Sequence, residues 1–253
     1  MKQRVLAVIP ARYASTRFPG KVIMPLAGKP LVQHTYERAA RAELVDEAVV
    51  ATDDEKVAEA LAPYNTPVML TSPDHPTGTD RIAEVMRQRE EDLVVNVQGD
   101  EPLIDPATID DAIRPLLERP GVVMSTARHL IPHIEQAQNP NIVKVVCDQT
   151  GLALYFSRAP IPHIRDAAEA GSEPACYWQH IGLYVYRRDF LLQYAEMPQT
   201  PLEKLEKLEQ LRVIENGYKI AVVETEYKSI GVDVFEDFEH VRAILEERPG
   251  NSS

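Results

Sequence analysis

The sequence predicts an α/β fold with a mostly parallel sheet, helices on both faces and an antiparallel insert. Continuous apolar runs alternate with amphipathic stretches, which is the pattern of parallel strands buried between helices. A chain of 253 residues with 44% hydrophobic residues can bury a substantial core. No linker divides the sequence, so we expect a single domain over residues 1–253, with the insert at about residues 140–190.

The expected strands are short runs rich in Val, Ile, Leu and Ala, at residues 5–9, 48–51, 68–70, 93–97, 122–127 and 221–223. The expected helices are amphipathic stretches at residues 31–42, 56–61, 81–90, 108–117 and around 201–216. Thr79 is the expected N-cap of the third helix. In the insert, apolar runs flank Gly151 and predict an antiparallel hairpin, followed by another strand at residues 182–186.

The bulk composition excludes several classes of protein. A formal net charge of −12 and a pI near 5.1 argue against a nucleic-acid partner, which needs a broad basic surface. No apolar run is long enough to cross a membrane, and no signal peptide is recognised, so we expect a cytoplasmic protein without a membrane partner. Two cysteines, Cys147 and Cys176, cannot form a disulfide framework.

The positive charges gather at the start of this acidic chain. Residues 1–36 contain no Asp or Glu, and the loop expected after the first strand reads IPARYASTRFPGK. It carries Arg12, Arg17 and Lys21, which suit a triphosphate bound at the carboxyl end of a parallel strand. Val22 after Gly20-Lys21 excludes a Walker A loop, and the sequence has no G-x-G-x-x-G. The alternative is a solvated basic turn.

Two aspartates are the candidate metal ligands. Asp100 follows the expected strand at residues 93–97, and Asp233 lies in the segment GVDVFED. Carboxylates beside phosphates imply a Mg²⁺ ion between them, because the like charges otherwise repel. Asp100 could instead form a turn, and Asp237 could cap a helix. The sequence does not show that the two aspartates meet.

Eight segments in order carry a family resemblance: IPARYASTRFPGK, TSPDHPTGTDR, NVQGDEP, NPNIVKVV, LYFSRAPIP, HIGLYVYR, LEKLEQLR and GVDVFED. Over essentially its whole length the chain closely resembles the 3-deoxy-manno-octulosonate cytidylyltransferases, also called CMP-Kdo synthetases. The shorter IPAR…S-x-R…GK start is shared with sialic-acid-type cytidylyltransferases. The sequence departs from the family pattern at Ser72, Pro73 and Val234.

The resemblance implies a Rossmann-like nucleotidyltransferase fold and a homodimer that converts CTP and Kdo into CMP-Kdo and pyrophosphate. It implies Mg²⁺ as cofactor and lipopolysaccharide biosynthesis in the bacterial cytoplasm as the setting. The insert would form the sugar site and a dimer arm. We expect an in-line displacement in which the anomeric hydroxyl of Kdo attacks the α-phosphorus of CTP.

The resemblance also implies residue roles. The catalytic set would be Arg17, Lys21, Asp100 and Asp233, of which Asp100 and Asp233 would bind the metal. Nucleotide binding would fall to Arg12, Ser15, Arg17, Lys21, Thr77, Gly78, Thr79, Gln98 and Asp100. The sugar would be bound by Gln98, Arg165, His180, Tyr184, Glu209 and Gln210.

Other interpretations stay open. His180 could be a strand histidine with satisfied hydrogen bonds, Tyr184 a core residue and Glu209 part of a solvated helix face. The acceptor could be sialic acid or another 2-keto sugar acid. A glycosyltransferase would release a nucleoside diphosphate, and a non-catalytic nucleotide sensor would bind CTP without releasing pyrophosphate.

Overall fold

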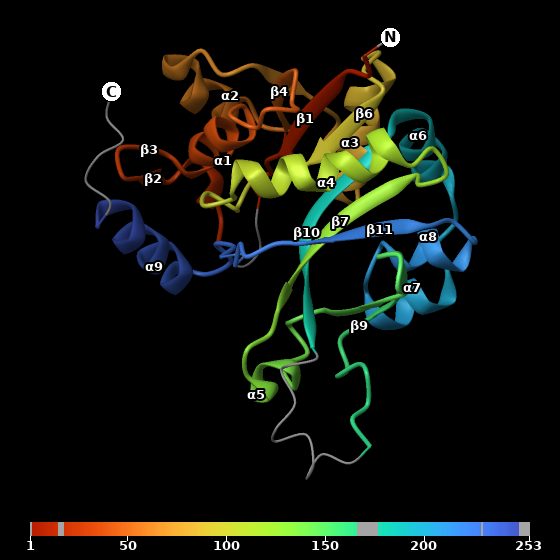
Figure 1. Ribbon diagram of the computed structural model, residues 1–253. Coiled ribbons are helices and arrows are strands. Elements are labelled where there is room, and N and C mark those ends of the chain that lie inside the picture. Colours follow the sequence, from red (N-terminus) through yellow and green to blue (C-terminus); the bar gives the residue numbers. More distant parts are fainter. Residues whose placement is uncertain (1, 15–17, 166–176, 229, 248–253) are drawn as a thin grey trace. The chain divides into compact units, whose positions relative to one another are not determined.

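The computed structural model describes residues 2–14, 18–165, 177–228 and 230–247 (Figure 1). Its contacts divide the chain into two compact units. The first unit comprises residues 1–110 and 229–253, and the second comprises residues 111–228. In the described ranges no helix is both long and apolar enough to span a bilayer. The single domain expected from the sequence stays a prediction, and each unit is described by itself.

The first unit is built on a parallel sheet whose strands have the order β6-β1-β4-β5. Their bounds are β1 Val5–Pro10, β4 Glu47–Thr52, β5 Val68–Leu70 and β6 Leu93–Asn96. In the central strand β1, Leu6 pairs with Val94 on one side and Glu47 on the other. Residues 5–9 of β1 are buried, because helices cover both faces of the sheet. The four predicted strands of this unit are confirmed.

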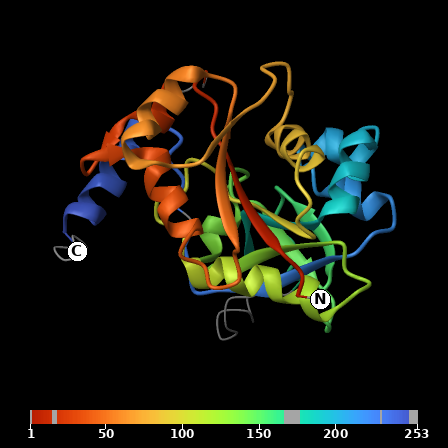
Figure 2. The same ribbon diagram turned by 90° about the horizontal axis from the view of Figure 1, so that it is seen from above.

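Right-handed crossovers determine which face each helix covers. The crossovers from β1 to β4 and from β4 to β5 run in one direction, so α1 (Leu31–Ala39) and α2 (Glu55–Leu61) share a face. The crossover from β5 back to β6 runs the opposite way and places α3 (Gly78–Arg87) on the other face (Figure 2). This unit also contains the short elements η1 Lys21–Ile23, β2 Pro25–Leu26, β3 Lys29–Pro30 and η2 Ala62–Tyr64. The longer helix α9, Phe235–Glu246, follows near the C-terminus.

The second unit contains a mixed sheet centred on β7. Strand β7 pairs in parallel with β11 and antiparallel with β10, and the hairpin β8–β9 joins the sheet through β10. The strand bounds are β7 Met124–Leu130, β8 Lys144–Cys147, β9 Ala153–Ser157, β10 Trp178–Arg187 and β11 Ile220–Glu224. The helices are α5 Ile134–Ala137, α6 Arg188–Glu196, α7 Pro201–Glu206 and α8 Leu211–Glu215, and α4 Pro106–Glu118 spans the chain boundary between the units. The predicted antiparallel hairpin around Gly151 is confirmed.

Two local predictions were wrong. Thr77 rather than Thr79 is the N-cap of α3, because its hydroxyl accepts from the backbone N–H of Asp80 at 3.2 Å. The carboxylate of Asp80 accepts in return from the N–H of Thr77, which completes a capping box.

The helix expected around residues 201–216 is interrupted. It consists of α7 and α8, because Lys207 adopts a left-handed conformation with φ 55° that ends α7. A buried ion pair between Arg212 of α8 and Glu203 of α7 holds the two short helices together. The charged pattern of this region therefore includes one buried pair.

Candidate active site

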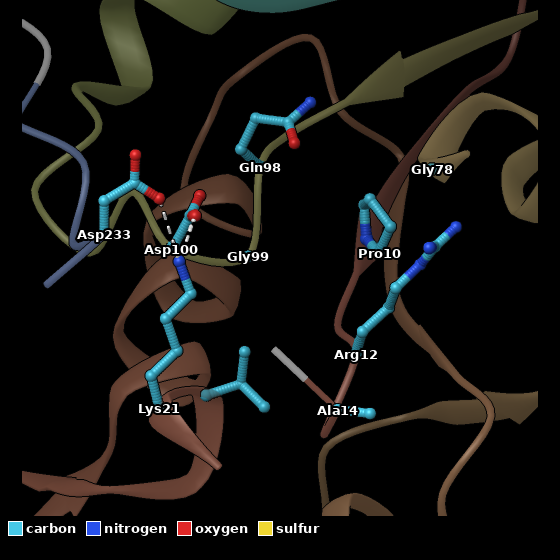
Figure 3. Close-up of a pocket in the computed structure, with 10 residues that line it drawn as sticks. Pro10, Arg12, Ala14, Lys21, Gly78, Gln98, Gly99, Asp100 and Asp233 are labelled. Carbon is cyan, nitrogen blue, oxygen red and sulfur yellow. Dashed lines mark hydrogen bonds and ion pairs between the residues drawn. The ribbon is translucent and has the colours of Figure 1, made fainter. Parts of the chain in front are cut away.

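A cavity of about 400 Å³ lies within the first unit, beyond the carboxyl ends of β1 and β6 (Figure 3). This volume is in the range of sites that hold a small ligand. The cavity is lined by Pro10, Arg12, Ala14, Lys21, Val22, Gly78, Gln98, Gly99, Asp100 and Asp233. Ligands of open α/β sheets bind beyond the carboxyl ends of the strands, and the cavity has this position.

The loop after β1 brings two cations to the cavity. Arg12 follows the strand directly, and its guanidinium Nη2 donates to the carbonyl of His75 at 2.8 Å. The N–H of Gly20 donates to the carbonyl of Tyr13 at 2.9 Å, so the two ends of the loop meet. Gly20 has φ 72°, which glycine adopts readily, and Lys21 begins η1 immediately after it. The predicted phosphate ligands Ser15 and Arg17 lie outside the described residues.

The loop after β6 brings Asp100 to the same cavity. The hydroxyl of Thr35 in α1 donates to the carbonyl of Gly99 at 3.3 Å, and the N–H of Val232 donates to the carbonyl of Asp100 at 2.9 Å. The second bond attaches the C-terminal segment to this loop. Two segments far apart in sequence are therefore held together by main-chain hydrogen bonding.

Lys21 connects the three segments. Its Nζ donates to the Asp100 Oδ2 at 2.7 Å and to the Val232 carbonyl at 2.6 Å, and it lies 3.4 Å from the Asp233 Oδ1 (Figure 3). The lysine side chain is only 10% exposed, whereas the side chains of Asp100 and Asp233 are 30% and 49% exposed. The structure therefore brings the two predicted carboxylates to one point, which the sequence does not show.

The adjacent carboxylate of Asp237 has a different function. It accepts from the N–H groups of Asp233 and Val234 at 2.9 and 3.0 Å, at the start of α9. Asp237 therefore caps the helix, and Asp233 is the aspartate that faces the cavity. Phe235 and Phe238 of α9 pack against Phe18, with ring centroids 6.1 and 6.2 Å from it. This aromatic contact fixes the C-terminal segment beside the loop that carries Lys21.

Asp100 and Asp233 could hold a divalent cation together with ligand oxygens. Carboxylate oxygens are the donors that Mg²⁺ prefers, and two of them converge here on one cationic atom. In the described ranges no group of three or more His, Cys, Asp or Glu side chains converges on a point. The remaining ligands would therefore come from a substrate and from water, as is usual for Mg²⁺ at phosphates.

The other predicted nucleotide ligands lie at the start of α3 and the end of β6. Gly78, which lies between Thr77 and Thr79 in the sequence, lines the cavity. Its position places the N-terminus of α3 at the cavity, where backbone N–H groups favour an anion. Gln98 also lines the cavity, and its amide nitrogen donates to the Asn96 Oδ1 at 3.2 Å. The hydroxyl of Thr77 is used in capping.

The remaining predicted sugar ligands lie in the second unit. The rings of His180 and Tyr184 on β10 are 5.3 Å apart, and the Tyr184 hydroxyl donates to the Gln210 Oε1 at 3.3 Å. Glu209 is next to Gln210, and its carbonyl accepts from the hydroxyl of Tyr194 at 2.6 Å. Desolvation, assisted by the charge of Glu209, raises the pKa of Tyr184. Four of these residues therefore form one polar cluster, in which His180 and Gln210 are buried and the other two are partly buried.

Arg165 is not part of that cluster. It is exposed at the end of a described segment and makes no hydrogen bond or ion pair with any residue that the structure describes. Its prediction as a ligand of the sugar carboxylate therefore stands on the resemblance alone.

The burial of His180 predicts a pH-dependent stability. Desolvation lowers the pKa of His180 to about 3, from 6.5 for an exposed histidine. Between these pH values the unfolded chain binds the proton and the folded chain does not. The free energy of unfolding is therefore expected to fall as the pH decreases from 6.5 towards 3, by up to ~1.4 kcal/mol per pH unit from this group.

Urea unfolding of the wild type and of His180→Gln over this pH range measures that contribution. The Gln side chain can keep a hydrogen bond to Thr126, the partner of the imidazole Nε2 at 3.0 Å, but it does not titrate. The variant is expected to lose less stability per pH unit than the wild type. Equal slopes for the two proteins would contradict the buried neutral histidine.

Several cavity residues were not among the predicted ligands: Pro10, Ala14, Val22 and Gly99. Pro10 and Gly99 lie inside the two motifs that identified the site. Their proximity in the sequence to Arg12 and Asp100 could have predicted that they line the cavity. The sequence also did not predict that the carbonyl of Val232 binds Lys21, because every residue type has a main-chain carbonyl.

The fold and the cavity define a nucleotidyltransferase. A family model described as cytidylyltransferase matches residues 6–220. The 3-deoxy-manno-octulosonate cytidylyltransferase of Geotalea uraniireducens is 56% identical over 245 residues, which cover 94% of this chain and 97% of that protein. The one of Geobacter sulfurreducens is 55% identical over 244 residues, which cover 94% and 97%. The chain belongs to the 3-deoxy-manno-octulosonate cytidylyltransferase family.

A solved structure of a family relative has the same fold as this chain over nearly its whole length. It is a CMP:2-keto-3-deoxy-manno-octonic acid synthetase complexed with CTP, and it is 40% identical to this chain. The similarity covers 96% of this chain and 99% of that one, with a TM-score of 0.91. The predicted nucleotidyltransferase fold is thereby confirmed.

Proposed function

We propose that the protein transfers CMP from CTP to the anomeric hydroxyl of 3-deoxy-D-manno-octulosonate (Kdo), giving CMP-Kdo and pyrophosphate. The observation that carries this function is the convergence of Lys21, Asp100 and Asp233 in the cavity of a cytidylyltransferase family member. Cations and carboxylates at one point suit a metal-bound triphosphate. The names of the relatives, which include one solved with CTP, support the nucleotide and the acceptor.

The chemical step is an in-line displacement. The C2 hydroxyl oxygen of Kdo forms a bond to the α-phosphorus of CTP while the bond from that phosphorus to the pyrophosphate oxygen breaks. The hydroxyl proton is released to water. Arg12 and Lys21 line the cavity, where they bind the phosphates and stabilise the negative charge that grows on the leaving pyrophosphate.

Asp100 and Asp233 are the proposed ligands of Mg²⁺. When bound, the ion would neutralise phosphate charge and lower the pKa of a hydroxyl group that it contacts. The two carboxylates keep their positions through main-chain hydrogen bonds: Val232 N–H donates to the carbonyl of Asp100, and Asp237 accepts from the N–H of Asp233. The charged groups are thus oriented before the substrates bind.

The cluster of His180, Tyr184, Glu209 and Gln210 is the proposed site of the sugar hydroxyls. Its polar groups are buried or partly buried, and such groups discriminate strongly between ligands that pair with them and ligands that do not. Arg165 is the proposed partner of the sugar carboxylate. The setting that we propose is lipopolysaccharide biosynthesis in the bacterial cytoplasm, and the assembly that we propose is a homodimer, which sedimentation at micromolar concentration would test.

A pyrophosphate-release assay tests the function. The wild type is incubated with Mg²⁺ and Kdo and with CTP, UTP, ATP or GTP, and then with CTP and either Kdo or sialic acid. CTP with Kdo is expected to have the highest kcat/KM, by ~100-fold over the other combinations. A preference for sialic acid would make the protein a cytidylyltransferase for another 2-keto sugar acid. Binding of CTP without pyrophosphate release with either acceptor would make it a nucleotide sensor.

A further inference from the structure

The ammonium group of Lys21 lies where three oxygens of the site converge. Asp100 Oδ2 and the carbonyl of Val232 accept from it at 2.7 and 2.6 Å, and the Asp233 Oδ1 is 3.4 Å away. An ammonium group has three N–H donors and no acceptor, so these oxygens match its full capacity. Without a nucleotide, this single side chain neutralises charge at both carboxylates.

Two of these three oxygens belong to the carboxylates of Asp100 and Asp233, which are the proposed metal ligands. A divalent ion that binds both carboxylates would stand within a few ångströms of the ammonium, where like charges repel strongly in a partly buried site. The lysine side chain is 10% exposed, so water screens this repulsion poorly. Metal binding in the absence of nucleotide therefore competes with Lys21.

A bound triphosphate changes this balance. Its oxygens offer Lys21 other acceptors in the same cavity, which Arg12 and Lys21 both line. A lysine carries a compact charge on a flexible stem, so it can exchange partners by side-chain rotation alone. When the ammonium group of Lys21 binds phosphate oxygens instead, the two carboxylates become available to a cation.

We infer that Lys21 is an exchangeable internal counter-ion that keeps the affinity of the Asp100–Asp233 pair for divalent cations low until a nucleoside triphosphate binds. This inference rests on the proposed function, in which both carboxylates bind the metal. Nucleotide and metal then strengthen each other's binding by the same factor, because coupling between two sites is reciprocal. The protein does not bind metal tightly while it has no CTP.

The test measures binding of Mn²⁺ by calorimetry, without nucleotide and with CTP, in the absence of the acceptor sugar. The wild type is expected to bind Mn²⁺ at least ~10-fold more tightly with CTP than without it. Lys21→Gln removes the charge and retains a donor for the Val232 carbonyl. Without nucleotide this variant is expected to bind Mn²⁺ at least ~10-fold more tightly than the wild type.

Two controls locate the effect. Lys29→Gln removes a charge from the same unit, where Lys29 pairs with Glu37 at 2.7 Å, and is expected to bind Mn²⁺ as the wild type does. In the double variant Lys21→Gln/Asp233→Asn the gain in affinity is expected to disappear. A gain of the same size in Lys29→Gln would show a general effect of net charge and overturn the inference.

The inference is also overturned if Lys21→Gln binds Mn²⁺ no more tightly than the wild type. Should that variant fail to fold, the wild type decides alone: equal Mn²⁺ affinity with and without CTP contradicts the counter-ion. Failure of the proposed function looks different, because it is the absence of pyrophosphate release from CTP and Kdo. A turnover of these substrates with no coupling of metal and nucleotide rejects only the inference about Lys21.

Discussion

Replacing Asp100 by asparagine (Asp100→Asn) is expected to lower kcat for pyrophosphate release by at least ~100-fold. The substitution keeps the size of the side chain and removes the charge that faces Lys21 at 2.7 Å. It also removes one of the two carboxylates proposed to bind Mg²⁺. The magnesium concentration that gives half-maximal activity should rise as well, because a neutral amide is a weaker ligand than a carboxylate.

Asp92→Asn is the matched control. Asp92 precedes the same strand, β6, at its amino end, where its carboxylate accepts from the N–H of Arg4 at 2.8 Å. Asp92 lies at the amino ends of the strands, whereas the cavity lies at their carboxyl ends, so the control should keep wild-type activity. An Asp100→Asn variant that turns over within about threefold of the wild type at the same magnesium concentration would reject the metal-binding role of Asp100.

Replacing Gly99 by alanine (Gly99→Ala) is the second large effect that we expect. A Cβ atom at Gly99 would stand 2.7 Å from the carbonyl oxygen of Pro10, at the end of β1. Main-chain atoms cannot give way as a flexible side chain can, so the loop that carries Asp100 must shift. Overpacking of this kind costs about 1–3 kcal/mol in stability. A displacement of a catalytic group by about 1 Å can lower kcat by ~100-fold.

Gly121→Ala separates this effect from the general cost of the substitution. A Cβ atom at Gly121 has no neighbour within 4 Å among the atoms that the structure describes, so we expect little change in stability or activity. Thermal unfolding and steady-state kinetics should be measured on both variants. A Gly99→Ala variant with wild-type kcat and thermal midpoint would show that neither activity nor stability depends on the close approach of Gly99 to Pro10.

The sequence was sufficient for most of the fold because strand formation here is dominated by burial. Strand β1 extends the predicted run only to Pro10, and all four residues of β6, Leu93–Asn96, are buried and lie within the predicted run. The errors concern single-residue choices. Thr77 and Thr79 are both good N-caps, and only the position of Asp80 three residues after Thr77 decides between them. The left-handed conformation of Lys207 ends a helix within a charged run that contains no Gly or Pro.

The candidate site could be predicted only in part. The motifs around Arg12, Lys21 and Asp100 follow two strands of a parallel sheet, so their meeting at one edge follows from topology. The contact between Lys21 and Asp233 does not follow, because the C-terminal segment returns to the first unit after residues 111–228. Its position depends on hydrogen bonds of the Val232 main chain, which residue type does not encode.

The measurement that tests the central claim most directly is a crystal structure of the wild type with CTP and Mn²⁺, without the acceptor sugar. The anomalous signal of manganese locates the ion independently of the protein atoms. We expect the ion between the carboxylates of Asp100 and Asp233, in contact with a phosphate oxygen of CTP, and the triphosphate beside Arg12 and Lys21. A triphosphate bound outside this cavity, or an ion that contacts neither aspartate, would contradict the account.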